Sequence, residues 1–431
     1  MTMKGELLRE TRSVCPVCLR NLPARLLRLP DGKVEMEKTC PMHGGFRVAV
    51  WQGKMDFSAW SAGSAPLPAD AGLRCPADCG LCAAHESESC CVLLEVTRRC
   101  NLRCRYCFAD GGSEAEDPTR DKLESAIRDI AARCDGPLLQ LSGGEPTLRD
   151  DLPELVRFAK DAGCAYVQLN TNGLRLAREP DYAKRLAEAG LDVVFLQFDG
   201  TRDEIYETLR GKPLLAPKLE AIQVCAALGV GVTLVPTVVR GVNDGDLGAL
   251  VRLAAELSPG VRGVHFQPVS YFGRFPDRAE AAERYTLDEL MDDLSTQANI
   301  PPDAFLPSRC DHPLCGFHAA FLVGENGVLQ PLSAGKRPEG RSSARENRDY
   351  VARRWMRSAS EAKPAPAASD VMDFDSFLYR LRHESLTLSA MAFQDAMNLN
   401  VERLRRCSLH VYERGKILPF CSRYLSAIKD E

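Results

Sequence analysis

The stretch Cys100-Asn101-Leu102-Arg103-Cys104-Arg105-Tyr106-Cys107 determines how the rest of this sequence is interpreted. Its three cysteines have the spacing C-x3-C-x2-C. A structural 4Fe-4S cluster normally takes four cysteine thiolates. Three thiolates leave one of the four irons without a protein ligand. A small molecule with an amino and a carboxylate group can chelate that iron. Zinc knuckles are the alternative, but they favour paired C-x2-C units with four protein ligands. The stretch therefore predicts an iron-sulfur cluster with an open iron.

A second stretch downstream, Ser142-Gly143-Gly144-Glu145, follows the apolar run Leu138-Leu139-Gln140-Leu141. Because glycine has no Cβ, the backbone at such a position can approach a ligand closely. Alone the stretch would be weak evidence, but it follows the cysteine loop in the order expected of a cofactor site. It therefore supports a bound cofactor beside the cluster.

The region from residue 91 onward has the rhythm of a parallel sheet with covering helices. Six short apolar runs predict strands over Val92–Val96, Leu138–Leu141, Tyr166–Leu169, Val193–Leu196, Val230–Val235 and Val264–Phe266. Amphipathic segments between them predict helices over 122–132, 152–162, 182–189, 216–228 and 247–257. Six strands fit a partial (β/α)6 TIM-like barrel, within the α/β class, better than a full eight-stranded one.

Polar residues follow each of these runs, at the strand ends where barrels of this kind place their chemistry. They are Thr97-Arg98, Ser142 to Glu145, Asn170-Thr171-Asn172-Gly173, Gln197 with Asp199-Gly200, Thr237, and Gln267-Pro268. Asn172-Gly173 and Asp199-Gly200 are also ordinary turn dipeptides, so each residue taken singly can equally be a plain structural feature.

The chain contains 18 cysteines, which in a reducing compartment indicates metal ligands rather than disulfides. Cys15, Cys18, Cys40 and His43 form a C-x2-C…C-x2-H pattern. This is the layout of a mononuclear tetrahedral site for zinc or for rubredoxin-like iron.

Two further cysteine groups predict auxiliary 4Fe-4S clusters. One comprises Cys75, Cys79, Cys82 and Cys90, with Cys91 as a substitute for Cys90 and His85 as a less favoured ligand. The other comprises Cys310, Cys315, Cys407 and Cys421, and a cluster there would close the open side of the barrel. Buried, unligated cysteine is the competing interpretation. We favour that interpretation for Cys134, Cys164 and Cys225.

We expect three regions along the chain. Residues 1–90 form an N-terminal cysteine-rich metal-binding domain, 91–300 the core barrel, and 301–431 a C-terminal auxiliary-cluster region with an Arg-rich linker. The basic stretch Lys336 to Arg357 suits a solvated or disordered segment, or else a lid that docks an anionic substrate. Lys363 to Ala367 is typical of a linker.

Bulk composition places few limits on partners. The formal net charge is −4, with 26% charged and 45% hydrophobic residues, which does not favour a nucleic-acid partner. The start of the chain, Met1 to Glu6, lacks the apolar stretch of a signal peptide, and no uncharged run reaches membrane-spanning length. We therefore expect a cytoplasmic protein without a membrane span.

The cysteine triplet, the aromatic Tyr106 before its last member and the stretch Ser142 to Glu145 together resemble the radical S-adenosylmethionine (SAM) superfamily. Four further motifs narrow the resemblance to one family within this superfamily: Cys-Pro-Val-Cys at 15–18, Cys-Pro-Met-His at 40–43, Cys75 to Cys82, and Pro419-Phe420-Cys421. They are similar to the tetraether lipid synthase family, whose archaeal members were described as methyltransferases acting on a hydroxymethylpterin.

The resemblance implies that Cys100, Cys104 and Cys107 hold a 4Fe-4S cluster that splits SAM into a 5′-deoxyadenosyl radical. The electron would come from a flavodoxin or ferredoxin. The cofactor would be bordered by Tyr106, Phe108, Gly143, Gly144, Glu145, Asn170, Thr171, Asn172, Gln197, Asp199 and Gln267.

The implied reaction is hydrogen abstraction from an unactivated carbon, for joining lipid chains or for adding a methyl group. The short Arg-rich region between Cys315 and Cys407 shows no long apolar surface, which leaves a compact small-molecule substrate open. Two less favoured functions also fit the sequence. One is a radical SAM enzyme that modifies RNA, and the other is a non-enzymatic iron-sulfur or zinc protein.

Overall fold

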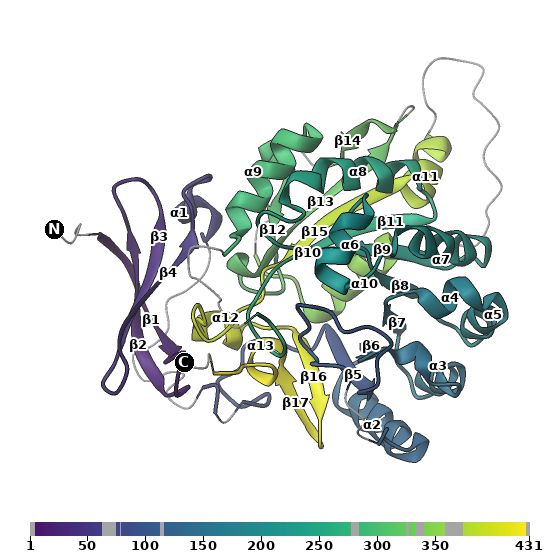
Figure 1. Ribbon diagram of the computed structural model, residues 1–431, viewed down its shortest axis with the longest axis horizontal. Helices are drawn as coiled ribbons and strands as arrows, with labels where there is room; N and C mark the ends of the chain where they lie inside the picture. Colours follow the sequence, from purple (N-terminus) through teal and green to yellow (C-terminus); the bar gives the residue numbers. More distant parts are fainter. Residues whose placement is uncertain are drawn as a thin grey trace.

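The computed structural model describes residues 5–62, 75–77, 79–112, 116–276, 284–324, 327–332, 340–357 and 374–427. These residues form two sheets. Figure 1 shows a small N-terminal sheet (purple) lying beside a much larger sheet, which carries helices along its outer side. Residues 363–367, expected as a linker, lie outside the described residues, as do 336–339 of the basic stretch.

The N-terminal sheet has four antiparallel strands in sequential order. They are β1 (Glu6–Val14), β2 (Asn21–Arg28), β3 (Val34–Cys40) and β4 (Gly44–Trp51), followed by the short helix α1 (Phe57–Trp60). Alternate residues are buried along β2 and β3, including Ala24, Leu26, Val34 and Met36, and they belong to one hydrophobic core together with residues of the larger sheet.

The predicted six-stranded core is confirmed. Its strands are parallel and adjacent in the order of the chain: β5 (Cys91–Thr97), β6 (Leu138–Gly143), β7 (Tyr166–Thr171), β8 (Val193–Gln197), β9 (Gly231–Val235) and β11 (Val261–Pro268). Their apolar residues are almost fully buried, as expected of parallel strands that are covered on both faces. The short strand β10 (Thr237–Val238) pairs with the end of β11.

The helices of the core follow the predicted segments. They are α2 (Arg120–Arg133), α3 (Leu152–Asp161), α4 (Leu174–Arg178), α5 (Pro180–Glu188), α6 (Asp203–Arg210), α7 (Leu215–Ala227), α8 (Leu247–Glu256) and α9 (Leu287–Ala298). Short 3-10 turns occupy Pro146–Leu148 and Asp244–Asp246. α4, α6 and α9 were not predicted, and α6 carries a residue of the site.

The C-terminal region adds a strand to each edge of the core. β15 (Ser385–Met391) pairs in parallel with β11, and β16 (Leu409–Glu413) pairs in parallel with β5. The sheet therefore contains eight neighbouring parallel strands. Antiparallel neighbours extend it on both sides: β12 (Leu306–Pro307), β13 (Gly316–Val323), β14 (Leu329–Pro331) and β17 (Lys416–Pro419). Short turns and helices complete the region: Pro302–Ala304, Pro313–Cys315, α11 (Phe374–His383), α12 (Val401–Arg405) and α13 (Phe420–Arg423).

Part of the basic stretch is a helix rather than a linker. α10 spans Ala344–Trp355 and starts with a capping box, in which Ser343 Oγ and the Glu346 carboxylate bond each other's backbone amides. Arg348 is buried and donates to the carbonyl of Asp135. The disordered interpretation is therefore wrong for residues 344–355, because the cap and the buried side of the helix were not evident from charge alone.

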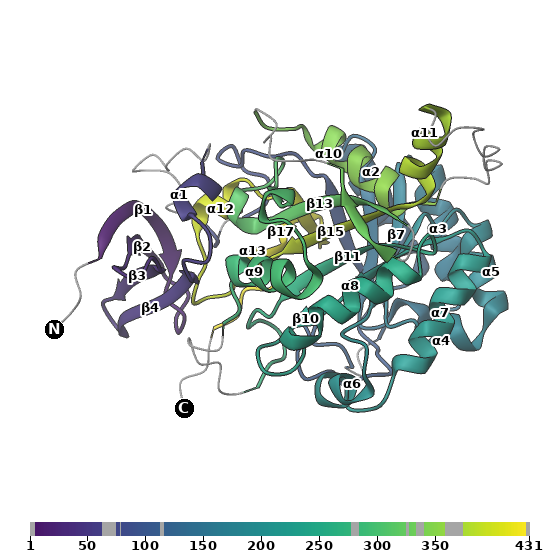
Figure 2. The same ribbon diagram turned by 90° about the horizontal axis from the view of Figure 1, so that it is seen from above.

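The four-stranded sheet packs against the C-terminal region and against α9 rather than standing free, as Figure 2 shows from above. Arg9 pairs with Glu402 at 2.9 Å, and the amides of Gln52 and Lys54 donate to the carboxylate of Asp288. Among the described residues, no helix is both long and apolar enough to cross a bilayer.

Candidate functional site

The three cysteines of the C-x3-C-x2-C loop lie directly after β5 and border a cavity of about 220 Å³ at the carboxyl ends of the core strands. Nearly all the residues predicted to border a cofactor line this cavity. They are Cys100, Cys104, Cys107, Tyr106, Phe108, Gly143, Gly144, Glu145, Asn170, Thr171, Asn172, Gln197 and Gln267. Asp199 is the exception.

The cysteine sulfurs are shielded from water. Burial raises the pKa of Cys100 to about 11 and also raises the pKa of Cys107. The backbone amide of Leu102 lies 3.4 Å from Cys100 Sγ, in position to donate. Cys104 is buried, and Cys100 and Cys107 are half-buried. Three thiols on one short loop suit an iron-sulfur cluster, whose positive irons would hold them as thiolates.

The glycines after β6 allow two backbones to touch. Gly144 donates to Thr97 O at 2.8 Å, and a Cβ at Gly144 would lie 2.1 Å from Arg99 O. At Gly143 the φ angle is +128°, and a Cβ would lie 2.2 Å from Thr97 O. From the sequence, these glycines were expected to let the backbone approach a ligand closely. The structure adds that any side chain here would collide with the cysteine loop itself.

Glu145 ties two strand ends together. Its carboxylate accepts hydrogen bonds from Thr147, from Thr171 Oγ1 at 2.7 Å and from the amide of Asn172 at 2.7 Å. The side chain is 1% exposed. Glu145 therefore fixes the Asn170–Asn172 segment at the cavity wall, and most of its hydrogen-bonding capacity is used within the protein.

Asp199 lies behind the cavity and holds a residue that lines it. Its carboxylate accepts from Arg210 Nε at 2.7 Å and Nη2 at 2.5 Å. Arg210, the last residue of α6, lines the cavity, and the side chains of both residues are at most 3% exposed. Sequence reasoning missed Arg210 because no local pattern marks a helix end as a cavity wall.

Other residues missed from the sequence support the cysteine loop. Arg274 donates from Nε to Cys104 O at 2.9 Å, and its backbone exchanges two 2.9 Å hydrogen bonds with Cys107. Lys218 is fully buried and donates to the carbonyls of Asn172 and Gln197, joining the ends of β7 and β8. These residues come from segments far from residue 100 in the sequence, so only the fold brings them together.

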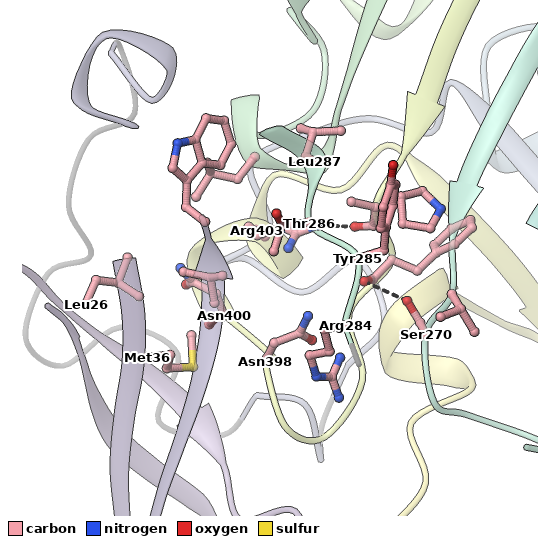
Figure 3. A pocket seen from close by; sticks show the side chains of 18 residues that line it. Leu26, Met36, Ser270, Arg284, Tyr285, Thr286, Leu287, Asn398, Asn400 and Arg403 are labelled. Carbon is pink, nitrogen blue, oxygen red and sulfur yellow. Dashed lines mark hydrogen bonds between the residues drawn. The ribbon is translucent and has the colours of Figure 1, made fainter. Parts of the chain in front are cut away.

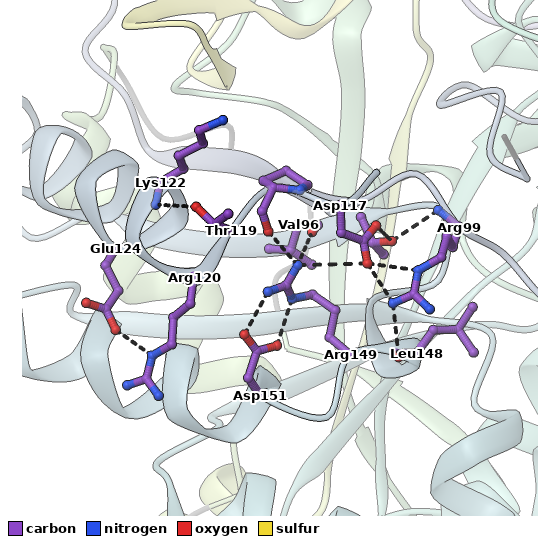
Figure 4. Close-up of polar contacts among 12 residues, drawn as sticks. Val96, Arg99, Asp117, Thr119, Arg120, Lys122, Glu124, Leu148, Arg149 and Asp151 are labelled. Atoms are coloured by element: carbon purple, nitrogen blue, oxygen red, sulfur yellow. Dashed lines mark hydrogen bonds and ion pairs between the residues drawn. The ribbon is translucent and has the colours of Figure 1, made fainter. Parts of the chain in front are cut away.

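A network of ion pairs holds the base of the loop, as Figure 4 shows. Asp117 accepts from Thr97 Oγ1 at 2.5 Å and from Arg99 Nε at 2.8 Å. Arg149 bonds the carboxylate of Asp151 through two nitrogens and donates to Val96 O at 3.2 Å. The turn into the cysteine loop is thereby fixed from both sides.

The N-terminal sheet brings Cys15, Cys18, Cys40 and His43 together, with all four ligand atoms within 4.8 Å of one another. His43 Nδ1 lies 3.5 Å from Cys15 Sγ and 3.4 Å from Cys40 Sγ, and the sulfurs of Cys18 and Cys40 are 3.9 Å apart. Tetrahedral zinc with ordinary bond lengths requires separations of about 3.5–3.8 Å between such ligands. The predicted set thus has the geometry of a single-ion site.

Comparisons with known proteins agree with this arrangement. Residues 94–254 match the model of the radical SAM superfamily, and residues 7–52 match the HMPTM N-terminal zinc ribbon domain. The 7,8-dihydro-6-hydroxymethylpterin dimethyltransferase of Methanocaldococcus jannaschii is 33% identical over 472 residues, which cover 96% of this chain and 93% of that protein. The chain belongs to the radical SAM superfamily, in the family of this archaeal protein.

Two further similarities cover only part of the chain. A probable GTP 3′,8-cyclase of Thermococcus kodakarensis is 34% identical over 168 residues, covering 38% of this chain and 52% of that protein. The crystal structure of Streptococcus suis SuiB bound to precursor peptide SuiA aligns with a TM-score of 0.42 and 15% identity, over 50% of this chain and 48% of that chain. Membership in the radical SAM superfamily makes the chain an enzyme with SAM and a 4Fe-4S cluster as cofactors.

The auxiliary cysteines of this radical SAM chain gather near the C-terminal strands. Cys90, grouped by sequence with Cys75, Cys79 and Cys82, packs against Cys310 and Ala344. Cys79 has its side chain beside those of Cys75 and Ser422. Cys407 Sγ lies 3.0 Å from Leu409 O. How these cysteines divide between clusters stays a prediction.

Two of the auxiliary cysteines receive hydrogen bonds from one segment. The amide of Gln394 donates to Cys421 Sγ at 3.3 Å, and Arg403 Nε donates to Cys315 Sγ at 3.3 Å. Such N–H···S contacts are typical of cluster-ligating cysteines and influence cluster potential. Phe420, next to Cys421, lines the cavity bordered by Cys100, Cys104 and Cys107, so Cys421 lies close to that cavity.

A second cavity, of about 600 Å³, lies on the other side of the barrel interior under α10. It shares four lining residues with the first cavity: Gln140, Phe195, His265 and Leu409. Its other apolar residues include Leu138, Leu306, Phe317, Ala320, Leu332, Val351, Trp355, Ala390 and Met391. These four shared side chains therefore form a layer with a cavity on each side. Barrel interiors of this kind are normally filled by side chains.

Replacing Cys18 by alanine should remove one bound metal ion per chain and leave the iron of the clusters in place. Cys18 is the exposed member of the four-ligand set, so its loss removes a ligand without opening the core. Zinc and iron would be quantified in the reconstituted variant and in Cys225→Ala, which alters a buried cysteine outside all four groups. Unchanged total metal in Cys18→Ala would contradict the assignment.

Proposed function

We propose that this radical SAM enzyme forms a carbon-carbon bond at an unactivated carbon of a substrate whose apolar part extends from the first cavity into the second. The cluster would be held by Cys100, Cys104 and Cys107, and SAM would occupy the 220 Å³ cavity. Bound there, the cluster and SAM supply an oxidising 5′-deoxyadenosyl radical when an electron arrives from a flavodoxin or ferredoxin. The surrounding side chains would bind and orient SAM and the substrate and exclude water.

The side chains around the cavity would orient SAM and exclude water. The Arg210 guanidinium, anchored by Asp199, offers N–H donors for a carboxylate. The Asn170–Asn172 segment offers amide and hydroxyl groups for a ribose, and Glu145 keeps it in place. Phe108, Phe272 and Phe420 line the cavity and pack against one another in tilted and edge-to-face contacts, and there they would limit entry of water and oxygen.

The observation that carries the proposal is that the two cavities adjoin, because Gln140, Phe195, His265 and Leu409 line both of them. A substrate confined to the first cavity would have no use for the second. Aliphatic and aromatic side chains such as Leu306, Phe317 and Trp355 line part of the larger cavity, which suits an apolar chain. Charged side chains, among them Arg309, Asp311 and Arg354, line another part and could bind a polar end of the same substrate. The apolar part of the lining favours coupling or methylation within a hydrocarbon segment, although the sequence showed no long apolar run between Cys315 and Cys407.

Methylation of a small heterocycle is the second candidate, and the Methanocaldococcus relative favours it by its name. Under reducing, anaerobic conditions the reconstituted enzyme would be incubated with SAM and either 6-hydroxymethyl-7,8-dihydropterin or a long-chain lipid in micelles. We expect a product with a new carbon-carbon bond from the lipid. Turnover of the pterin alone would replace the first candidate with the second, and absence of any SAM cleavage would contradict both.

Filling the second cavity should block product formation without stopping SAM cleavage. Ala320 of β13 is 5% exposed and lines the second cavity but not the first, so Ala320→Trp places a bulky ring only where the substrate's apolar part would lie. Product per 5′-deoxyadenosine should fall by about tenfold or more. Ala165→Trp, at an exposed position before β7, serves as the matched control. Equal product ratios in both variants would argue against the second cavity as part of the site.

A further inference from the structure

A buried lysine joins the N-terminal ribbon (β1 to β4) to the loop that follows β15. Lys38 of β3 is 2% exposed. Its Nζ donates to Ser13 Oγ at 2.9 Å within the ribbon, and to Ala396 O at 2.8 Å and Met397 O at 2.7 Å in the loop. These three acceptors match the three N–H donors of an ammonium group.

The loop it reaches, residues 392–400, has no regular secondary structure and forms part of the first cavity's wall. Asp395 is fully buried and accepts from Arg284 at 2.6 and 2.7 Å and from the amide of Tyr271 at 3.0 Å. Ser270 Oγ donates to Phe393 O at 3.0 Å. Because Ser270 and Phe393 both line the cavity, the loop and the tail of β11 are fixed to each other there.

The ribbon touches the end of the same loop as well. Thr11 Oγ1 donates to Asn400 Oδ1 at 2.8 Å, and both residues are buried. Figure 3 shows Leu26 and Met36 of the ribbon facing Asn398 and Asn400 across a small cavity of about 50 Å³. A loop without its own backbone ladder depends on such side-chain contacts for its shape.

We propose that Lys38 is a positioning residue for the SAM cavity. It holds the carbonyls of residues 396 and 397 and thereby sets the place of Asp395, the tail of β11 and the ring of Phe393. The ribbon is then a brace for the cavity wall in addition to a metal-binding module. The expected effect of Lys38 on SAM binding rests on the proposed assignment of SAM to the first cavity. Its expected effect on the loop does not depend on that assignment.

Lys38→Met tests the proposal, because methionine keeps the length and apolar stem but leaves three oxygens without their donor. The full-length, reconstituted variant would be compared with Lys33→Met, a change in the turn before β3 of a side chain that is 44% exposed. Hydrogen exchange by mass spectrometry reports on the loop. SAM affinity is read from the SAM-induced change in the EPR signal of the reduced cluster, and iron and zinc are quantified in parallel.

We expect Lys38→Met to keep its metals, to exchange faster in residues 392–400 and 269–272, and to bind SAM about fivefold more weakly, with kcat for SAM cleavage little changed at saturation. Unchanged exchange, or faster exchange with unchanged SAM affinity, would overturn the proposal. If Lys38→Met does not fold, Thr11→Val, which removes the second contact, is judged by the same outcomes. Failure of the wild type and Lys33→Met to bind SAM would count against the proposed function instead.

Discussion

Replacing Cys100, Cys104 and Cys107 together by alanine should remove about four irons per chain and abolish SAM cleavage. The remaining iron should stay, because the other cysteine groups come from other segments of the chain, at 15–43, 75–90 and 310–421. The measurement is anaerobic reconstitution, quantification of iron and sulfide, and detection of 5′-deoxyadenosine after reduction with dithionite.

The matched control replaces three other buried cysteines, Cys134, Cys164 and Cys225, which pack into the hydrophobic core. That variant should keep all its iron and its SAM cleavage. If the cluster variant lost all iron, the division of cysteines among separate centres would be wrong. If it still produced 5′-deoxyadenosine at the wild-type rate, the chemistry would have to lie elsewhere in the chain.

The core strands could be predicted because their signal is local. A parallel strand covered on both faces appears as a short apolar run, and Leu138–Leu141 and Val193–Leu196 have that form. β15 was missed because its sequence, Ser-Leu-Thr-Leu-Ser-Ala-Met, alternates like a half-exposed strand. Its polar residues are buried all the same. Ser389 bonds His265 of the neighbouring strand at 2.9 Å, a pairing across 124 residues that no local pattern can reveal.

The residues of the candidate site also fall into those that a local sequence pattern predicts and those that only the fold brings to the site. The residues that immediately follow the core strands, from Gly143 to Gln267, line the cavity as the strand-end rule implies. Arg210, Lys218 and Arg274 were not found, since they reach the site from helices or from a distant loop. The ribbon ligands were found because two short motifs carry them, yet the contacts of Lys38 with residues 396 and 397 span more than 350 positions.

Asp199 shows where the strand-end rule stops being sufficient. The rule identifies a polar residue at the correct end of β8, but it does not distinguish a side chain that faces a ligand from one that holds another side chain. In the structure Asp199 bonds Arg210 through both carboxylate oxygens and accepts from the amide of Thr237 at 3.1 Å. Its expected role therefore changes from lining the cofactor cavity to orienting a cation that lines it.

This difference leads to a large and specific effect on stability. Asp199→Ala should lower the free energy of unfolding by about 3–5 kcal/mol, because it leaves the buried Arg210 guanidinium without its counter-ion. The double variant Asp199→Ala/Arg210→Met removes both charges, so it should be more stable than Asp199→Ala alone by roughly 1–2 kcal/mol. Both variants should bind SAM more weakly than the wild type. Chemical denaturation of the reconstituted proteins provides the comparison, and a double variant no more stable than the single one would mean that Asp199 acts through other partners than Arg210.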